Sequence, residues 1–155
     1  YPFGRYSPEI IQAARAQGIK YSRTVVSTRD FHVPADFMEW HPTCHHGDPK
    51  LMDLGKQFLG FRGLGMMVMY VWGHSFEFAW TDSWKIIEDF AAYMGGREDL
   101  WYCTNMELCQ YVEAIRAQEF SADGKLLYNP TAQTVWFETA GKVDSIAPGE
   151  CKPVE

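Results

Sequence analysis

The feature of this sequence that most constrains its fold is the alternation of helix-like and strand-like segments over the first 120 residues. Four segments carry apolar residues at helical spacing, and a run typical of a β-strand separates each from the next. The strand-like runs are IKYSRTVVS at 19–27, GLGMMVMYVW at 63–72 and DLWYCT at 99–104. Alternation at this spacing predicts a parallel sheet with right-handed crossovers, and so an α/β fold with an open sheet or a barrel.

Local signals mark where the helices should begin and where the pattern changes. The predicted helix starts are Ser7-Pro8, Asp48-Pro49, residues 81–83, and Thr104, which begins a capping box. After Phe120, Asp123-Gly124 predicts a tight turn, and VWFET at 135–139 followed by Ala140-Gly141 predicts a hairpin. We therefore expect residues 121–155 to form a small antiparallel β appendage of the domain built by residues 1–120.

Charge and composition exclude some partners and favour others. The formal net charge of -6 argues against a nucleic-acid backbone or an anionic membrane surface as partner. No apolar run approaches the roughly 18 residues that a membrane-spanning helix needs. Aromatic residues make up 15% of the chain, which suits a carbohydrate partner because aromatic faces stack on sugar rings. An aromatic-rich core explains the same figure.

The four cysteines are Cys44, Cys103, Cys109 and Cys151, and none forms a C-x-x-C pair. A chain of this length can build a core and does not need a disulfide framework. We therefore expect free thiols, as in a reducing, cytoplasmic compartment.

Three places in the sequence follow predicted strands or precede helices, where functional residues of parallel α/β folds gather. They are residues 1–4 (YPFG), the long loop 28–47, and Gly73-His74 at the end of the apolar run. The loop contains four of the five histidines, and a loop of this length inside a domain is usually functional.

The loop histidines raise the question of a metal site. His41, Cys44, His45 and His46 are all residue types that bind zinc. However, the segment is not a regular scaffold, and the sequence offers no matching distant pair of ligands. We therefore predict no metal ligand in this chain. His45 or His46 is expected to face a substrate cleft, with surface or helix-capping roles as the alternative.

Three short motifs together resemble the polysaccharide deacetylases of the NodB-homology type (carbohydrate esterase family 4). Residues 2–4 (PFG) match the end of the R-x-P-[YF]-G motif, with Tyr1 in its variable position. Residues 36–40 (DFMEW) fit D-x-x-[DE]-W loosely, and Trp72-Gly73-His74 corresponds to L-x-H with Trp in place of Leu. The resemblance covers about residues 1 to 105.

The resemblance implies a fold, a reaction and a cofactor. The fold would be part of a distorted (β/α)7-type barrel, and the reaction the metal-dependent removal of acetyl groups from N- or O-acetylated sugars. The family's first two motifs supply the catalytic base and the metal ligands, and both belong upstream of Tyr1. The divalent metal, usually zinc, would therefore be held mainly by residues outside this chain. The missing N-terminal half, or a second copy of the chain, would be its partner.

The resemblance also implies roles for individual residues. The backbone N–H of Phe3 would donate to the oxyanion, and His74 would protonate the departing amine. The substrate-binding residues would be Tyr1, Pro2, Trp40, His45, His46 and Trp72. Considered without the resemblance, His74 can equally be a structural histidine, Phe3 part of a rigid turn, and both tryptophans core residues.

Two other functions fit the same residues. One is a non-catalytic carbohydrate-binding fragment, in which an aromatic cleft holds sugar without cleaving it. The other is a hydrolase that acts on a small non-sugar amide.

Overall fold

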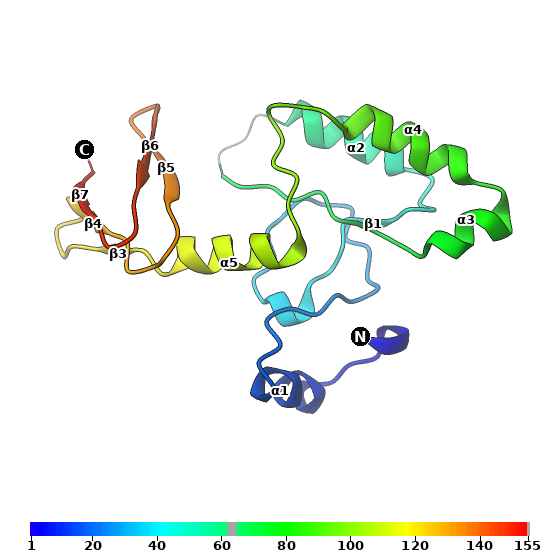
Figure 1. Ribbon diagram of the computed structural model, residues 1–155, viewed down its shortest axis with the longest axis horizontal. Helices are drawn as coiled ribbons and strands as arrows, with labels where there is room; N and C mark the ends of the chain where they lie inside the picture. The colour runs from blue at the N-terminus through cyan, green and yellow to red at the C-terminus, as the bar shows by residue number, and fades with distance from the viewer. Residues whose placement is uncertain (62–64, 155) are drawn as a thin grey trace. The chain divides into compact units, whose positions relative to one another are not determined.

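The structure is a computed structural model that describes residues 1–61 and 65–154. The chain divides into two compact units, Tyr1–Trp101 and Tyr102–Glu155, which are described separately. The fold is mixed α/β, with five α-helices and small sheets in the described residues (Figure 1). None of the sheets in this part of the chain closes into a barrel. The expectation of a barrel fragment covering residues 1–120 therefore stays a prediction.

The first unit contains four α-helices and two short 3-10 helices. They are η1 (Pro2–Gly4), α1 (Pro8–Ala16), η2 (Phe37–Glu39), α2 (Leu51–Gly60), α3 (Ser75–Thr81) and α4 (Trp84–Met94). The predicted starts of α1 and α4 are confirmed, and the Ser7 hydroxyl caps α1 by accepting the N–H of Ile10. Helix α3 was not predicted, because its seven residues are too few to show a helical period.

The strand predictions for the first unit are largely wrong. Only β1 (Cys44–His45) and β2 (Val71–Trp72) form, as a parallel pair in which Cys44 lies opposite Val71 and His45 opposite Trp72. Residues 65–70 stay outside β2, and residues 63–64 of that predicted strand lie outside the described residues. Residues 99–104 form no strand.

The strand-like run at 19–27 pairs with the loop that follows it. Two of its backbone N–H groups donate to loop carbonyls, from Ser22 to Phe37 and from Thr24 to Trp40, and Thr28, the residue after the run, donates to Pro42. Within this run, Arg23 forms an isolated parallel β-bridge with Trp40. These bonds satisfy the backbone locally, so the segment does not add to a larger sheet.

One core of the first unit lies between α2 and α4, which pack side by side (Figure 1). Its buried members are Cys44, Leu51, Leu54, Phe90 and Met94. Gly55 permits this close packing, because a Cβ there would lie 3.0 Å from Cε2 of Phe90. Cys44 anchors β1 in this core, and β1 in turn positions its last residue, His45, and the next residue, His46.

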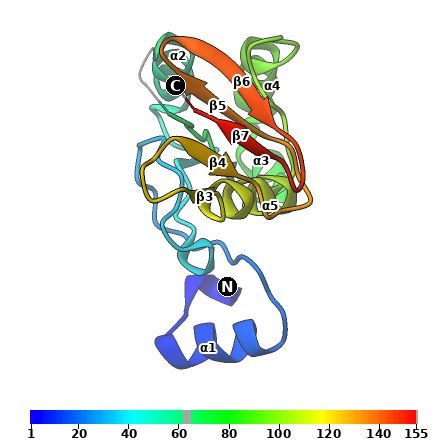
Figure 2. The same cartoon turned by 90° about the vertical axis from the view of Figure 1, so that its left-hand side faces the viewer.

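The second unit combines one helix with two antiparallel sheets. It contains α5 (Asn105–Arg116), the sheet β3 (Glu119–Phe120), β4 (Leu126–Tyr128) and β7 (Cys151–Pro153), and the hairpin β5 (Val135–Thr139) and β6 (Lys142–Ile146), seen in Figure 2. The capping box at Thr104, the turn at Asp123-Gly124 and the hairpin are confirmed. Ala140 and Gly141 both have positive φ, as a tight hairpin turn requires.

Two further expectations can be compared with the structure. All four cysteines are free thiols, as expected. Among the described residues, every helix is too short or too polar to cross a lipid bilayer.

Candidate metal and acid–base site

The candidate site forms where β1 and β2 end. Because the two strands are parallel and paired, the residues that follow them emerge side by side. His46 follows β1, and its backbone N–H donates to the Trp72 carbonyl at 2.7 Å. His74 follows β2 and is the N-cap residue of α3. The two histidine-bearing segments therefore lie together at the ends of the strands, where we expected functional residues to gather.

Glu77, in the first turn of α3, lies at the centre of the site. Its Oε1 is 2.9 Å from Nδ1 of His74 and forms a hydrogen bond with it. Its Oε2 is 3.0 Å from Nε2 of His45 and 2.8 Å from Nε2 of His46. The hydrogen bond with His74 holds the pKa of Glu77 below its usual value, so the carboxylate is ionised at neutral pH.

His46 is the most enclosed of the histidines, with 9% of its side chain exposed. Its ring packs on Phe78, with centroids 4.1 Å apart. On the other side is Gly73, where a Cβ would lie 1.6 Å from Cδ2 of His46. The His46 Nε2 atom is buried and has no hydrogen-bond partner in the described part of the chain, although Glu77 is close.

His45 is partly buried beside His46. Its ring meets the Trp72 ring edge-on, with centroids 4.6 Å apart, and its Nδ1 accepts the N–H of Gly47 at 3.1 Å. Burial lowers the pKa of His45, and the neighbouring His46 lowers it further. Both effects favour the neutral imidazole, which is the form that binds metals.

His74 is half-exposed and stacks on Phe76, with centroids 5.0 Å apart. The Glu77 carboxylate binds Nδ1 and so fixes the orientation of the ring. This leaves Nε2 as the nitrogen that can exchange a proton with a ligand. A carboxylate-supported, accessible histidine is the usual arrangement of a general acid or base.

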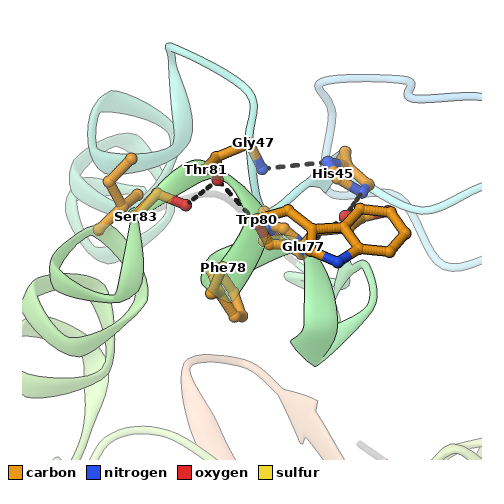
Figure 3. Close-up of a pocket in the computed structure, with 9 residues that line it drawn as sticks. His45, Gly47, Glu77, Phe78, Trp80, Thr81 and Ser83 are labelled. Carbon is orange, nitrogen blue, oxygen red and sulfur yellow. Dashed lines mark hydrogen bonds and ion pairs between the residues drawn. The ribbon is translucent and has the colours of Figure 1, made fainter.

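A pocket of about 240 Å³ opens beside these side chains (Figure 3). Its lining residues are His45, His46, Gly47, Glu77, Phe78, Trp80, Thr81, Ser83 and Ile86. Trp80 is 78% exposed, and its ring contacts that of Phe76, with centroids 4.6 Å apart. Trp80, which contacts Phe76, thus lines a pocket that also contains the polar side chains of His45, His46 and Glu77.

His45, His46 and Glu77 could together hold a metal ion. Each offers one ligand atom, and the three atoms lie within 4.8 Å of one another. The sequence offered no distant pair of ligands for the loop histidines, and the structure places one distant residue, Glu77, beside His45 and His46. The prediction that this chain contributes no metal ligand stays a prediction. The sequence signal that could have indicated Glu77 is its spacing of three residues from His74, because residues at this spacing lie on one face of a helix.

The remaining predicted site residues lie in different surroundings. Trp72 borders the site, with the Arg23 guanidinium 4.0 Å above its ring. Trp40 is only 2% exposed and packs on Phe37, so it is a core residue with no face open to a ligand. His41 contacts Thr24 instead of joining the other histidines.

The segment YPFG is not brought into the cluster by any contact described here. The Phe3 side chain is 97% exposed, and its backbone has a positive φ of 55°. Pro2 lies beside it in η1. Tyr1 donates its hydroxyl to the Met38 carbonyl at 2.7 Å and stacks on Tyr6. The proposed roles of Tyr1, Pro2 and Phe3 stay predictions.

Comparison of the chain with protein-family models, with curated proteins and with solved structures finds no match. The resemblance to polysaccharide deacetylases therefore stays a prediction from the motifs.

Proposed function

We propose that this chain carries the general acid of a metal-dependent hydrolase that removes acetyl groups from N- or O-acetylated sugars. The observation that supports this most is the hydrogen bond of 2.9 Å between Nδ1 of His74 and Oε1 of Glu77. The motifs at residues 2–4, 36–40 and 72–74 supply the reaction class.

In this reaction His74 acts through its Nε2 atom. Hydrolysis of an amide or ester passes through a tetrahedral intermediate, whose leaving nitrogen or oxygen must gain a proton. Histidine side chains titrate near neutral pH, so a protonated His74 can donate that proton. The Glu77 carboxylate holds the orientation of the ring through the hydrogen bond with Nδ1.

A divalent metal, zinc by resemblance, supplies a bound water of lowered pKa and a polarised acetyl carbonyl when it is present. The resemblance assigns most of its ligands to residues outside this chain. Within the chain, the residues that fit a metal are His45, His46 and Glu77, because two imidazoles and a carboxylate form a donor set typical of zinc.

The exposed pair Phe76 and Trp80 favours a sugar over a small non-sugar amide as the substrate. Trp80 lines the pocket, and exposed apolar ring faces can stack on a pyranose ring while its hydroxyls stay in water. The same pair also favours the second candidate, a carbohydrate-binding site without catalysis. The two candidates differ only in whether acetate is released.

The test is acetate release from N-acetylglucosamine oligomers by the protein that contains this chain, in the presence of zinc. We expect His74→Gln to lower turnover by about 10²–10⁴-fold, as for loss of a general acid. His32→Gln, which removes a well-exposed histidine outside the cluster, serves as the matched control. Equal turnover of His74→Gln and wild type would refute the acid role. Oligomer binding without any acetate release would support the second candidate instead.

A further inference from the structure

We propose that His45, His46 and Glu77 form a zinc site made entirely of this chain's side chains, and that Glu77 joins this site to His74. Glu77 would bind the ion through Oε2 while it holds His74 through Oε1. The inference goes beyond the proposed hydrolysis and does not rest on it, because metal binding can be measured without a substrate.

The first argument is the lack of hydrogen bonding between atoms that lie very close together. Nε2 of His46 lies 2.8 Å from Oε2 of Glu77, yet it is buried and forms no hydrogen bond with the carboxylate or with any other group among the described residues. Buried polar atoms without partners are costly and rare.

The distances suit two ligands of one ion. Zinc binds histidine nitrogen and carboxylate oxygen at about 2.0–2.2 Å, so two neighbouring ligand atoms of a tetrahedral ion lie about 3.3–3.6 Å from each other. The separations of 2.8 and 3.0 Å to Oε2 of Glu77 are a few tenths of an ångström shorter, so the side chains would open slightly around the ion. An ion between these atoms would satisfy the lone pairs that the protein leaves unpaired.

The second argument is that the ligands are held in place. The His46 ring lies between Phe78 and the bare backbone of Gly73, where no Cβ fits. The carboxylate of Glu77 is oriented by the His74 ring through its other oxygen. Ligands that are already oriented lose little conformational entropy when a metal binds.

The third argument concerns the kind of ion and the open side of the site. Two histidines and one glutamate are a set that catalytic zinc sites use, with a further position left for water or substrate. The pocket of about 240 Å³ beside His45 and Glu77 provides that open side (Figure 3). A purely structural zinc site would be closed by a fourth protein ligand.

The hydrogen bond between Gly47 and His45 gives the proposal a specific signature. The Gly47 N–H donates to Nδ1 of His45, so the neutral ring carries its proton on Nε2. To bind zinc through Nε2, His45 must move that proton to Nδ1, and the Gly47 N–H must then turn away. The backbone amide of Gly47 should therefore respond to zinc, although it cannot be a ligand.

The test is zinc binding to the 155-residue chain, measured by equilibrium dialysis and elemental analysis, with cobalt(II) absorption as a second readout of coordination. Wild type should retain about one zinc per chain. His46→Gln and Glu77→Gln should weaken binding by more than about tenfold, since even the loss of a group supporting a ligand costs 10- to 100-fold. His32→Gln and His41→Gln are the matched controls and should bind as wild type does.

Several results would overturn the site. They are a wild-type chain that retains no zinc, equal affinity in wild type and in both ligand variants, or an unchanged Gly47 amide resonance on saturation with zinc. His74→Gln separates this inference from the proposed function, because it should lose turnover by about 10²–10⁴-fold while the chain still binds one zinc, at an affinity lowered by the loss of the ring that supports Glu77 but less than in Glu77→Gln. Cluster-dependent zinc binding without acetate release would refute the hydrolase and support the site.

Discussion

Gly73 lies so close to His46 that a Cβ at position 73 would be 1.6 Å from Cδ2 of the histidine. The peptide after β2 thus forms one wall of the niche that holds the ring, and Phe78 forms another. Position 73 therefore controls the geometry of the candidate site without contributing a polar group to it.

Gly73→Ala should accordingly displace His46 and damage the cluster. We expect a loss of about 1–3 kcal/mol in the free energy of unfolding, typical of overpacking, and more than tenfold weaker zinc binding. Urea unfolding and zinc titration measure the two effects. Gly60→Ala is the matched control, because a Cβ there meets nothing within 4 Å. Wild-type zinc affinity in Gly73→Ala would show that His46 is not held by this wall.

Stability of the zinc-free chain should depend on pH through His45. Its pKa is lowered on folding, mainly by burial, so between the folded and the unfolded pKa the unfolded state binds more protons. Stability therefore rises with pH in that window and falls as the pH drops below about 6.5, the usual value for histidine. His45→Gln should flatten this dependence, as measured by urea midpoints between pH 5 and 7.5. An unchanged slope in the variant would assign the pH effect to other groups.

Local signals in the sequence were sufficient for helix starts and turns. The Ser7 cap, the Thr104 capping box and the Ala140-Gly141 turn depend on chemistry within a few residues, and all three form. The strand predictions for the first unit largely failed, because β-propensity indicates a surface that suits a strand but does not indicate which segment it pairs with. The run at 19–27 satisfies its backbone on the adjoining loop.

The candidate site was predicted only in part, because the position of Glu77 depends on how two segments of the chain pair with each other. His74, His45, His46 and Trp72 could be selected because they follow predicted strands or lie in the long loop. Glu77 was missed, since its position depends on helix α3, which is too short to show a period, and on the register of β1 against β2. Trp40 was selected by its motif, but the loop folds it into the core.

Trp80→Ala tests the sugar-stacking surface. Because the side chain is 78% exposed, its loss should leave the thermal midpoint nearly unchanged. Affinity for N-acetylglucosamine oligomers should fall roughly three- to tenfold, the equivalent of one aromatic contact. Calorimetric titration measures this change, with Trp136→Ala, an exposed tryptophan of the second unit, as the control. Equal losses in both variants would indicate nonspecific adhesion to aromatic residues.

Asn129→Ala should destabilise the second unit. Asn129 is fully buried, and its amide donates to the carbonyls of Gln133 and Ile146 while its oxygen accepts from Gln118. Removing the amide leaves several buried groups unpaired, which should cost about 2–4 kcal/mol in the free energy of unfolding. Urea unfolding followed by Trp136 fluorescence measures it. A loss below about 0.5 kcal/mol would mean that water replaces the amide.

The central claim is that Glu77 binds a metal ion through one carboxylate oxygen and orients the general acid His74 through the other. The most direct measurement is zinc affinity and acetate release for Glu77→Gln and His74→Gln side by side. We predict that Glu77→Gln loses both zinc affinity and turnover, whereas His74→Gln loses turnover but still binds one zinc, with a smaller loss of affinity than Glu77→Gln. Zinc affinity and turnover at wild-type levels in Glu77→Gln would contradict the account.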